Sequence, residues 1–130
     1  MTPEEKKSYT HYRLNRAFQT LEEADWMAQK EHWNTCANRL YYAAFYALTA
    51  LLLQEGYETQ THKGVKILLG EHFIKTGKID VEKGRFYSQL FDKRQAGDYA
   101  DLLDWTADDI LPLIEPTKEF IEVIKTWIEK

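Results

Sequence analysis

The sequence LYYAAFYALTALLL extends from Leu40 to Leu53 and, with tyrosine counted as apolar, is interrupted only at Thr49. A membrane-spanning helix needs about 18 or more apolar residues, whereas this run has 14. No glycine or proline lies between Pro3 and Gly56 to interrupt a helix. We therefore predict a helix buried at the centre of a helical domain, and we expect no association with a membrane.

The residues that precede this helix predict a second one packed beside it. From Leu14 to Ala28, apolar side chains recur every three or four residues, which is the spacing of one buried helical face. The pattern breaks between Lys30 and Trp33, and Asn34 or Thr35 is suited to cap the next helix. Because the connection is short, the two helices should be antiparallel neighbours.

Further helices are predicted downstream. Thr61 is a candidate cap for a helix that ends at Gly77, and Asp80 for a helix that extends to about Gln95 and breaks near Gly97.

The last helix should begin at a capping box formed by Thr106 and Asp109, and Pro112 and Pro116 predict a bend within it. No segment alternates apolar and polar residues as a strand does. The predicted fold is all-α, an up-and-down bundle of four or five helices that forms a single domain over residues 1–130.

Composition and charge limit the possible functions. The single Cys36 excludes a disulfide framework, and the polar N-terminus predicts no secretory signal, so we expect a cytoplasmic protein. The net charge is −4, yet residues 62–94 carry 8 basic and 4 acidic side chains. This basic middle is either a surface that faces an anion or a set of solvated helix faces.

The common signatures of cofactor and metal sites are missing. There is no glycine-rich phosphate loop, and the four histidines have none of the spacings of metal ligands. We therefore predict neither a cofactor nor a metal ion. The histidines are His11, His32, His62 and His72.

Three local features could bind an anion. Arg39 precedes the apolar helix and must reach water, a carboxylate or another anion. His62 and Lys63 follow the Thr61 cap, where free backbone donors could hold a phosphate or carboxylate, although a simple cap is the commoner explanation of this pattern.

The third feature is Arg94, which lies four residues before Asp98. The two side chains could form an ion pair if the helix continues.

Four motifs in this order resemble one family, the HEPN (higher eukaryotes and prokaryotes nucleotide-binding) domain proteins. The motifs are Arg-x-Tyr-Tyr-Ala-x-Phe at 39–45, Thr-His-Lys-Gly-Val at 61–65, Gly-Glu-His-Phe at 70–73 and Arg-x-x-x-Asp-Tyr at 94–99. The resemblance covers residues from about 10 to 130. It implies a helical bundle that is commonly a homodimer, encoded beside a minimal nucleotidyltransferase and often forming a toxin–antitoxin pair with it.

The resemblance also implies a ribonuclease motif, from which this sequence departs. Active HEPN ribonucleases have an arginine, then a polar residue, and a histidine after four to six intervening residues. Arg94 and Gln95 match the first part, but the positions for the histidine hold Tyr99, Ala100 and Asp101. The sequence therefore does not decide whether the protein is an enzyme. Because the motif is incomplete, we favour a protein without the standard HEPN ribonuclease activity.

Three hypotheses follow. The first is a HEPN partner subunit of a minimal nucleotidyltransferase, which binds a nucleotide or an RNA phosphate through Arg39, His62, Lys63 and Arg94. The second is a metal-independent ribonuclease with a divergent site at Arg94, Asp98 and Tyr99. The third is a helical interaction module without a nucleic-acid role.

Overall fold

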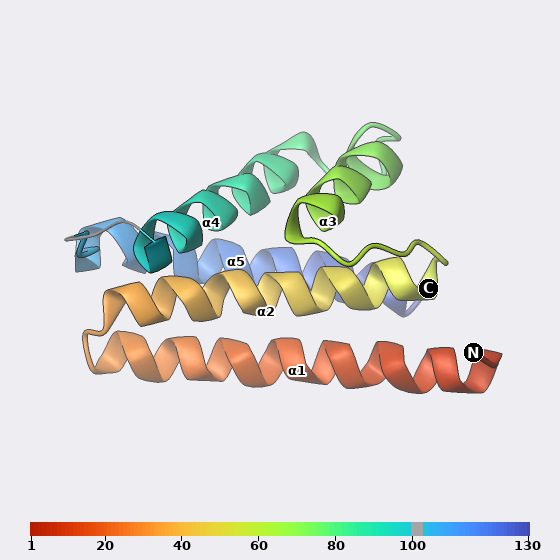
Figure 1. Ribbon diagram of the computed structural model, residues 1–130, viewed down its shortest axis with the longest axis horizontal. Coiled ribbons are helices and arrows are strands. Elements are labelled where there is room, and N and C mark those ends of the chain that lie inside the picture. Colours follow the sequence, from red (N-terminus) through yellow and green to blue (C-terminus); the bar gives the residue numbers. More distant parts are fainter. Residues whose placement is uncertain (100–102) are drawn as a thin grey trace.

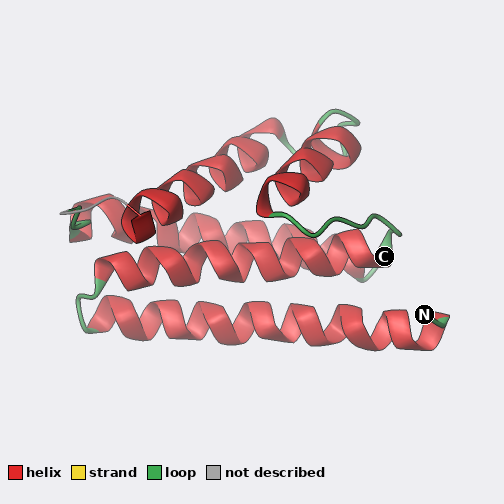
Figure 2. Cartoon of the chain, in the orientation of Figure 1, coloured by secondary structure: helices red, strands yellow, loops and turns green. Residues whose placement is uncertain are grey.

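The apolar stretch of the sequence forms the central helix of the fold. In the computed structural model, which describes residues 1–99 and 103–130, this helix is α2 (Trp33–Gln54), and it contacts α1, α3, α4 and α5. Among the described residues the bundle consists of helices joined by loops and contains no strand (Figure 2). The remaining elements are α1 (Pro3–Gln29), α3 (His62–Leu69), the π-helical turn η1 (Gly70–Ile74), α4 (Val81–Tyr99) and α5 (Ala107–Ile128).

The long helices alternate in direction along the chain. Figure 1 shows α1 running antiparallel beside α2, α4 crossing obliquely above it, and α5 returning behind α2 in the same direction as α2. The arrangement confirms the predicted all-α, up-and-down bundle. No helix among the described residues is both long enough and apolar enough to cross a membrane.

Burial of α2 explains its composition. Eleven of its residues are buried, including Leu40, Tyr41 and Leu48, which are fully inaccessible to solvent. Each fully buried leucine contributes roughly 1.5–3 kcal/mol relative to an exposed one. Cys36 lies in the same core, where burial raises the pKa of its thiol to about 11. The thiol is therefore a core group and is protonated at neutral pH.

The start of α2 differs from the prediction. Neither Asn34 nor Thr35 caps it; His32 occupies the cap position without a side-chain hydrogen bond. The Asn34 amide instead donates to the carbonyl of Leu103 at 2.9 Å and accepts from the backbone N–H of Trp105 at 2.8 Å. The capping prediction was wrong because this side chain holds the segment before α5 against α2.

The end of α4 also differs. The helix continues through Gly97 to Tyr99 and does not stop near Gln95. Gly97 lies against Trp105, since a Cβ at this position would be 3.0 Å from the indole Nε1. The glycine therefore permits a close contact and does not break the helix, and the continued helix places Arg94 and Asp98 on successive turns. Residues 100–102, which include part of the predicted break, lie outside the described residues.

Two other helix starts agree with the sequence. Thr61 accepts from the backbone N–H of Gly64 at 2.8 Å and caps α3, and Thr106 forms a capping box with Asp109 at the start of α5. The helix α5 continues as one element through both of its prolines.

Candidate functional site

Arg94 is a charged residue in the core of the bundle. It projects from α4 and is only 5% exposed. Its guanidinium carbon lies 4.8 Å from the centre of the Tyr41 ring, and 5.7 Å from the centres of both the Tyr42 and Phe91 rings. The faces of these rings stabilise the cation, and α2 and α4 together therefore form an aromatic cup around it.

The charge of Arg94 is only partly neutralised. The nearest carboxylate oxygen belongs to Asp98, 3.8 Å from Nη1, and this distance exceeds that of a direct hydrogen bond. The buried Nε has no hydrogen-bond partner among the described residues. Asp98 also accepts from the Asn38 amide, at 3.1 and 3.4 Å. The ion pair that the four-residue spacing predicted is thus confirmed, but in a loose form that leaves donors of Arg94 available.

Arg39 on α2 lies beside one of the same aromatic rings, at the edge of the core. Its Nη1 donates to Glu23 on α1 at 3.1 Å, and its Nε and Nη2 donate to the Asn38 side-chain oxygen at 3.1 and 2.8 Å. The Arg39 guanidinium carbon is 5.4 Å from the centre of the Tyr42 ring. Since Asn38 bonds both Arg39 and Asp98, it fixes the two charged side chains relative to each other.

His62 reaches this group from the start of α3. Its Nδ1 is 2.7 Å from the Tyr41 hydroxyl, and its ring stacks on Phe45 with the ring centres 4.5 Å apart. Burial lowers the pKa of His62 below its usual value, and the charge of Arg94 lowers it further. The imidazole is therefore mainly neutral at pH 7, and no partner for its Nε2 occurs in the part of the chain that the structure describes.

We call these residues the Arg94 cluster. It consists of Arg94, Asp98, Asn38, Arg39 and His62 around the rings of Tyr41 and Tyr42. The structure thus brings together four of the residues that the sequence singled out. Lys63 is exposed and has no described contact with the cluster, and the Tyr99 side chain is 75% exposed at the end of α4.

Sequence reasoning did not assign roles to Asn38, Tyr41 and Tyr42. Tyr41 and Tyr42 lie within the motif at 39–45 and Asn38 directly precedes it, but their apolar surroundings indicated only core packing. The useful signal is their spacing, because residues three and four apart on a helix share a face, so Asn38, Tyr41 and Tyr42 lie together.

The cluster offers cations and hydrogen-bond donors but no metal site. Over residues 1–99 and 103–130, no group of three or more histidine, cysteine, aspartate or glutamate side chains could hold an ion. Arginine donors in a fixed planar arrangement match the oxygens of a phosphate or carboxylate.

Comparison with known proteins identifies the family. The model of the HEPN domain matches residues 10–127. This chain belongs to the HEPN family. The match confirms the resemblance that the four motifs indicated, and it contains every residue of the Arg94 cluster.

Individual relatives span nearly the whole chain. A UPF0332 protein of Thermotoga maritima is 34% identical over 96% of this chain and 95% of its own length. A UPF0332 protein of Gloeobacter violaceus is 32% identical over 98% of both chains. A protein of Methanocaldococcus jannaschii with the name "Putative toxin MJ0142" is 26% identical over 88% of this chain and 78% of its own.

Proposed function

We propose that this chain is a toxin-like HEPN protein that binds a phosphate of RNA or of a nucleotide at the Arg94 cluster and acts with a minimal nucleotidyltransferase. In this proposal the protein lacks the standard HEPN ribonuclease activity. The main support for phosphate binding is that Arg94 is a buried cation with little compensating charge. Among the described residues, its one carboxylate neighbour is Asp98, whose oxygen lies 3.8 Å from Nη1.

A phosphate would supply the hydrogen-bond acceptors that the Arg94 guanidinium lacks among the described residues. A buried charge without adequate partners is costly, and an anionic oxygen that accepts from the guanidinium offsets that cost. Arg39 adds a second cation beside the same Tyr42 ring. The two arginines could contact one phosphate or two neighbouring phosphates.

The toxin-like role and the partner rest on the family. HEPN proteins of this type are expected beside minimal nucleotidyltransferases, and the M. jannaschii relative has the word toxin in its name. A homodimer is part of the same expectation. Tyr9 and Trp26 on α1 are about half exposed and supply aromatic surface for an interface, whereas Trp33 at the start of α2 is less exposed.

The proposed lack of the standard HEPN ribonuclease activity rests on the missing histidine. Tyr99 stands at the first of its possible positions, and a tyrosine is a weak base near neutral pH. Asp98 is already paired with Arg94 and bonded by Asn38, so it is poorly placed to remove a proton.

A second candidate function is favoured by the position of His62. A neutral imidazole next to Arg94 could take the proton of a ribose 2′-hydroxyl. The 2′-oxygen would then form a bond to the adjacent phosphorus, the bond from phosphorus to the 5′-oxygen would break, and that oxygen would accept a proton. Arg94 would stabilise the negative charge on the phosphate. This ribonuclease would use His62 in place of the missing motif histidine.

One experiment separates these functions. Labelled single-stranded RNA is incubated with the protein in EDTA at low salt, and binding and cleavage are both measured for the wild type, Arg94→Ala and Arg85→Ala. Arg85 is exposed on α4 and paired with Glu82, so its substitution controls for the loss of one positive charge. We expect Arg94→Ala to weaken binding at least tenfold, Arg85→Ala to have little effect, and no protein to cleave RNA.

Two other outcomes would change the conclusion. Wild-type affinity in a folded Arg94→Ala protein would contradict the proposed binding site. If Arg94→Ala unfolds, Arg94→Lys serves in its place, because it keeps the charge but loses the planar donors. Cleavage that disappears in His62→Gln would establish the second function.

A further inference from the structure

A second cationic surface lies beside the Arg94 cluster, between α1, α2 and the segment 57–61. It contains two adjoining hollows of about 430 and 350 Å³, which share five lining residues. We call them together the α1–α2 groove. The shared residues are Arg13, Thr49, Thr59, Gln60 and Val65.

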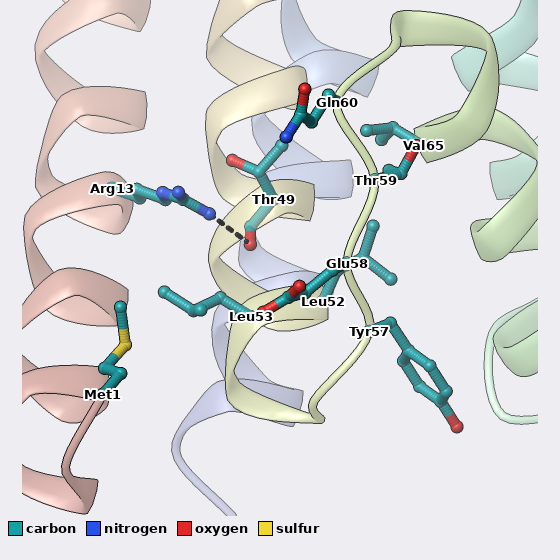
Figure 3. Close-up of a pocket in the computed structure, with 10 residues that line it drawn as sticks. All are labelled: Met1, Arg13, Thr49, Leu52, Leu53, Tyr57, Glu58, Thr59, Gln60 and Val65. Atoms are coloured by element: carbon teal, nitrogen blue, oxygen red, sulfur yellow. Dashed lines mark hydrogen bonds between the residues drawn. The ribbon is translucent and has the colours of Figure 1, made fainter.

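Arg13 lies at the point where the two hollows meet. Figure 3 shows its side chain extending from α1 toward Thr49 on α2, with Thr59 and Gln60 on the other side of the groove. One of its terminal nitrogens donates to the Thr49 carbonyl at 3.3 Å. This bond orients the guanidinium toward the groove and leaves its other donors for a ligand.

Arg16 is one helical turn further along α1 and lines the second hollow. Its guanidinium carbon is 5.1 Å from the centre of the Tyr46 ring. Neither Arg16 nor Arg13 forms an ion pair among the described residues.

The charge of the groove differs from that of the whole chain. The chain has a net charge of −4. The second hollow nevertheless contains two arginines and no acidic residue, while Glu58 lines only the first. Two arginines without an ion pair among the described residues, one of them over the Tyr46 ring, favour an anionic ligand that also has flat surfaces for stacking.

The groove continues into the Arg94 cluster through aromatic contacts on α2. Phe45 lines the second hollow and stacks on His62 of the cluster, with ring centres 4.5 Å apart. Tyr46 lines the same hollow, and the centre of its ring lies 5.9 Å from the centre of the Tyr42 ring. Arg94 and Arg39 both lie over the Tyr42 ring. The adjacent Tyr42 and Tyr46 rings therefore connect the arginines of one site to Arg16 in the other.

We infer that the α1–α2 groove is a second contact site for single-stranded RNA, so that one strand extends from the Arg94 cluster along α2 to Arg16 and Arg13. The choice of RNA rests on the proposed function. Tyr42 and Thr49 are separated by about 10 Å along the helix axis. This distance corresponds to about three stacked nucleotides of one strand. A mononucleotide has phosphate at one end only, so it cannot place one phosphate at Arg94 and another at Arg13.

The test compares a 12-nucleotide oligouridine with uridine monophosphate. Binding of each is measured at several salt concentrations for the wild type and for Arg13→Gln/Arg16→Gln. The matched control is Lys75→Gln/Arg85→Gln, which removes two exposed positive charges that do not line the groove. Thermal unfolding of each variant establishes that it is folded.

We expect the groove variant to bind the oligouridine at least tenfold more weakly, while its affinity for uridine monophosphate stays at the wild-type value. The slope of log K against log salt should decrease in magnitude by about 1.4, since each lost phosphate contact on a single strand contributes about 0.7. Oligouridine affinity and a slope equal to those of the matched control would overturn the proposal.

Adding Arg94→Ala distinguishes failure of the groove from failure of the proposed function. If Arg94→Ala weakens binding of both ligands and the groove variant weakens neither, the groove proposal fails and the proposed function stands. If only the groove variant weakens oligouridine binding, the groove is an RNA site and the Arg94 cluster is not. If neither variant differs from the matched control, both proposals fail.

Discussion

At the scale of single residues, Arg94 is the side chain on which the account depends. Taking a guanidinium out of water is costly, and here three aromatic rings and one loosely placed carboxylate compensate for that cost. The buried Arg94 guanidinium therefore retains N–H donors that a ligand can use. The surrounding side chains should therefore adjust how strongly a phosphate binds.

Asp98 competes with a phosphate for Arg94. We predict that Asp98→Asn binds single-stranded RNA roughly three- to tenfold more tightly than the wild type, because the substitution removes a negative charge 3.8 Å from the guanidinium. Titration with labelled RNA at low salt measures this change, and Glu82→Gln, which removes an exposed carboxylate on the same helix, is the control. Weaker binding by Asp98→Asn would mean that Asp98 itself contributes to the ligand site.

His62 should make the stability of the protein depend on pH. Burial, with a smaller effect from Arg94, lowers its pKa in the folded state below 6.5. As the pH falls through 6.5, the unfolded chain takes up the proton first, so the folded state loses stability. We predict that the decrease in melting temperature from pH 7 to pH 5 is smaller in His62→Gln than in the wild type. His11→Gln, at an exposed position on α1, should retain the full decrease, and an equal decrease in all three proteins would contradict the prediction.

At the scale of helices, the sequence predicted the elements better than their ends. The apolar spacing of α1, α2 and α5 is a local property, and it was sufficient to locate these helices. The roles of Asn34 and Gly97 depend on Trp105, which is distant from Asn34 in the chain and contacts both only in the folded protein. The ends of α2 and α4 therefore could not be predicted from local pattern.

The same distinction applies to the site. The pairing of Arg94 with Asp98 follows from a four-residue spacing on one helix and was predictable. The contact of His62 with Tyr41 joins α3 to α2 across 21 residues, and no pattern in the sequence specifies it. What brings His62 to the cluster is the packing of α3, which starts at the Thr61 cap.

Two glycines in the α3 region should respond oppositely to alanine. At Gly64, a Cβ would lie 2.0 Å from Thr59 Oγ1 and 2.8 Å from Thr61 Oγ1, so Gly64→Ala must displace the cap. At Gly70 the space is open and the backbone is helical. We predict that Gly64→Ala lowers the free energy of unfolding by about 1–3 kcal/mol and that Gly70→Ala raises it by about 0.5–1 kcal/mol. Urea denaturation measures both changes, and a Gly64→Ala protein as stable as the wild type would show that the cap is not required.

At the scale of the whole molecule, the bundle places cationic side chains along one line of an acidic protein. α1 supplies Arg13 and Arg16, α2 supplies Arg39, and α4 supplies Arg94, and all four lie at or beside α2. The central helix is therefore both the core of the fold and the axis of the proposed binding surface.

The oligomeric state is a second property of the whole molecule. We predict that the protein is a homodimer, as the family resemblance implies, and that light scattering coupled to size-exclusion chromatography gives twice the mass of the chain. Trp26→Glu tests whether the exposed aromatic surface of α1 forms the interface, and it should shift the mass toward that of a monomer. Glu22→Gln, an exposed position on the same helix, is the control. A wild-type protein that is monomeric at micromolar concentration would contradict the prediction.

The central claim is that the Arg94 guanidinium binds a phosphate, and its own Nε–H reports on this most directly. In a proton–nitrogen NMR spectrum of arginine side chains, the Arg94 signal is identified as the one that disappears in Arg94→Lys. We predict that this signal shifts progressively as uridine monophosphate is added, while the signal of Arg85 stays in place. An Arg94 signal that does not move at concentrations where RNA binds would contradict the account.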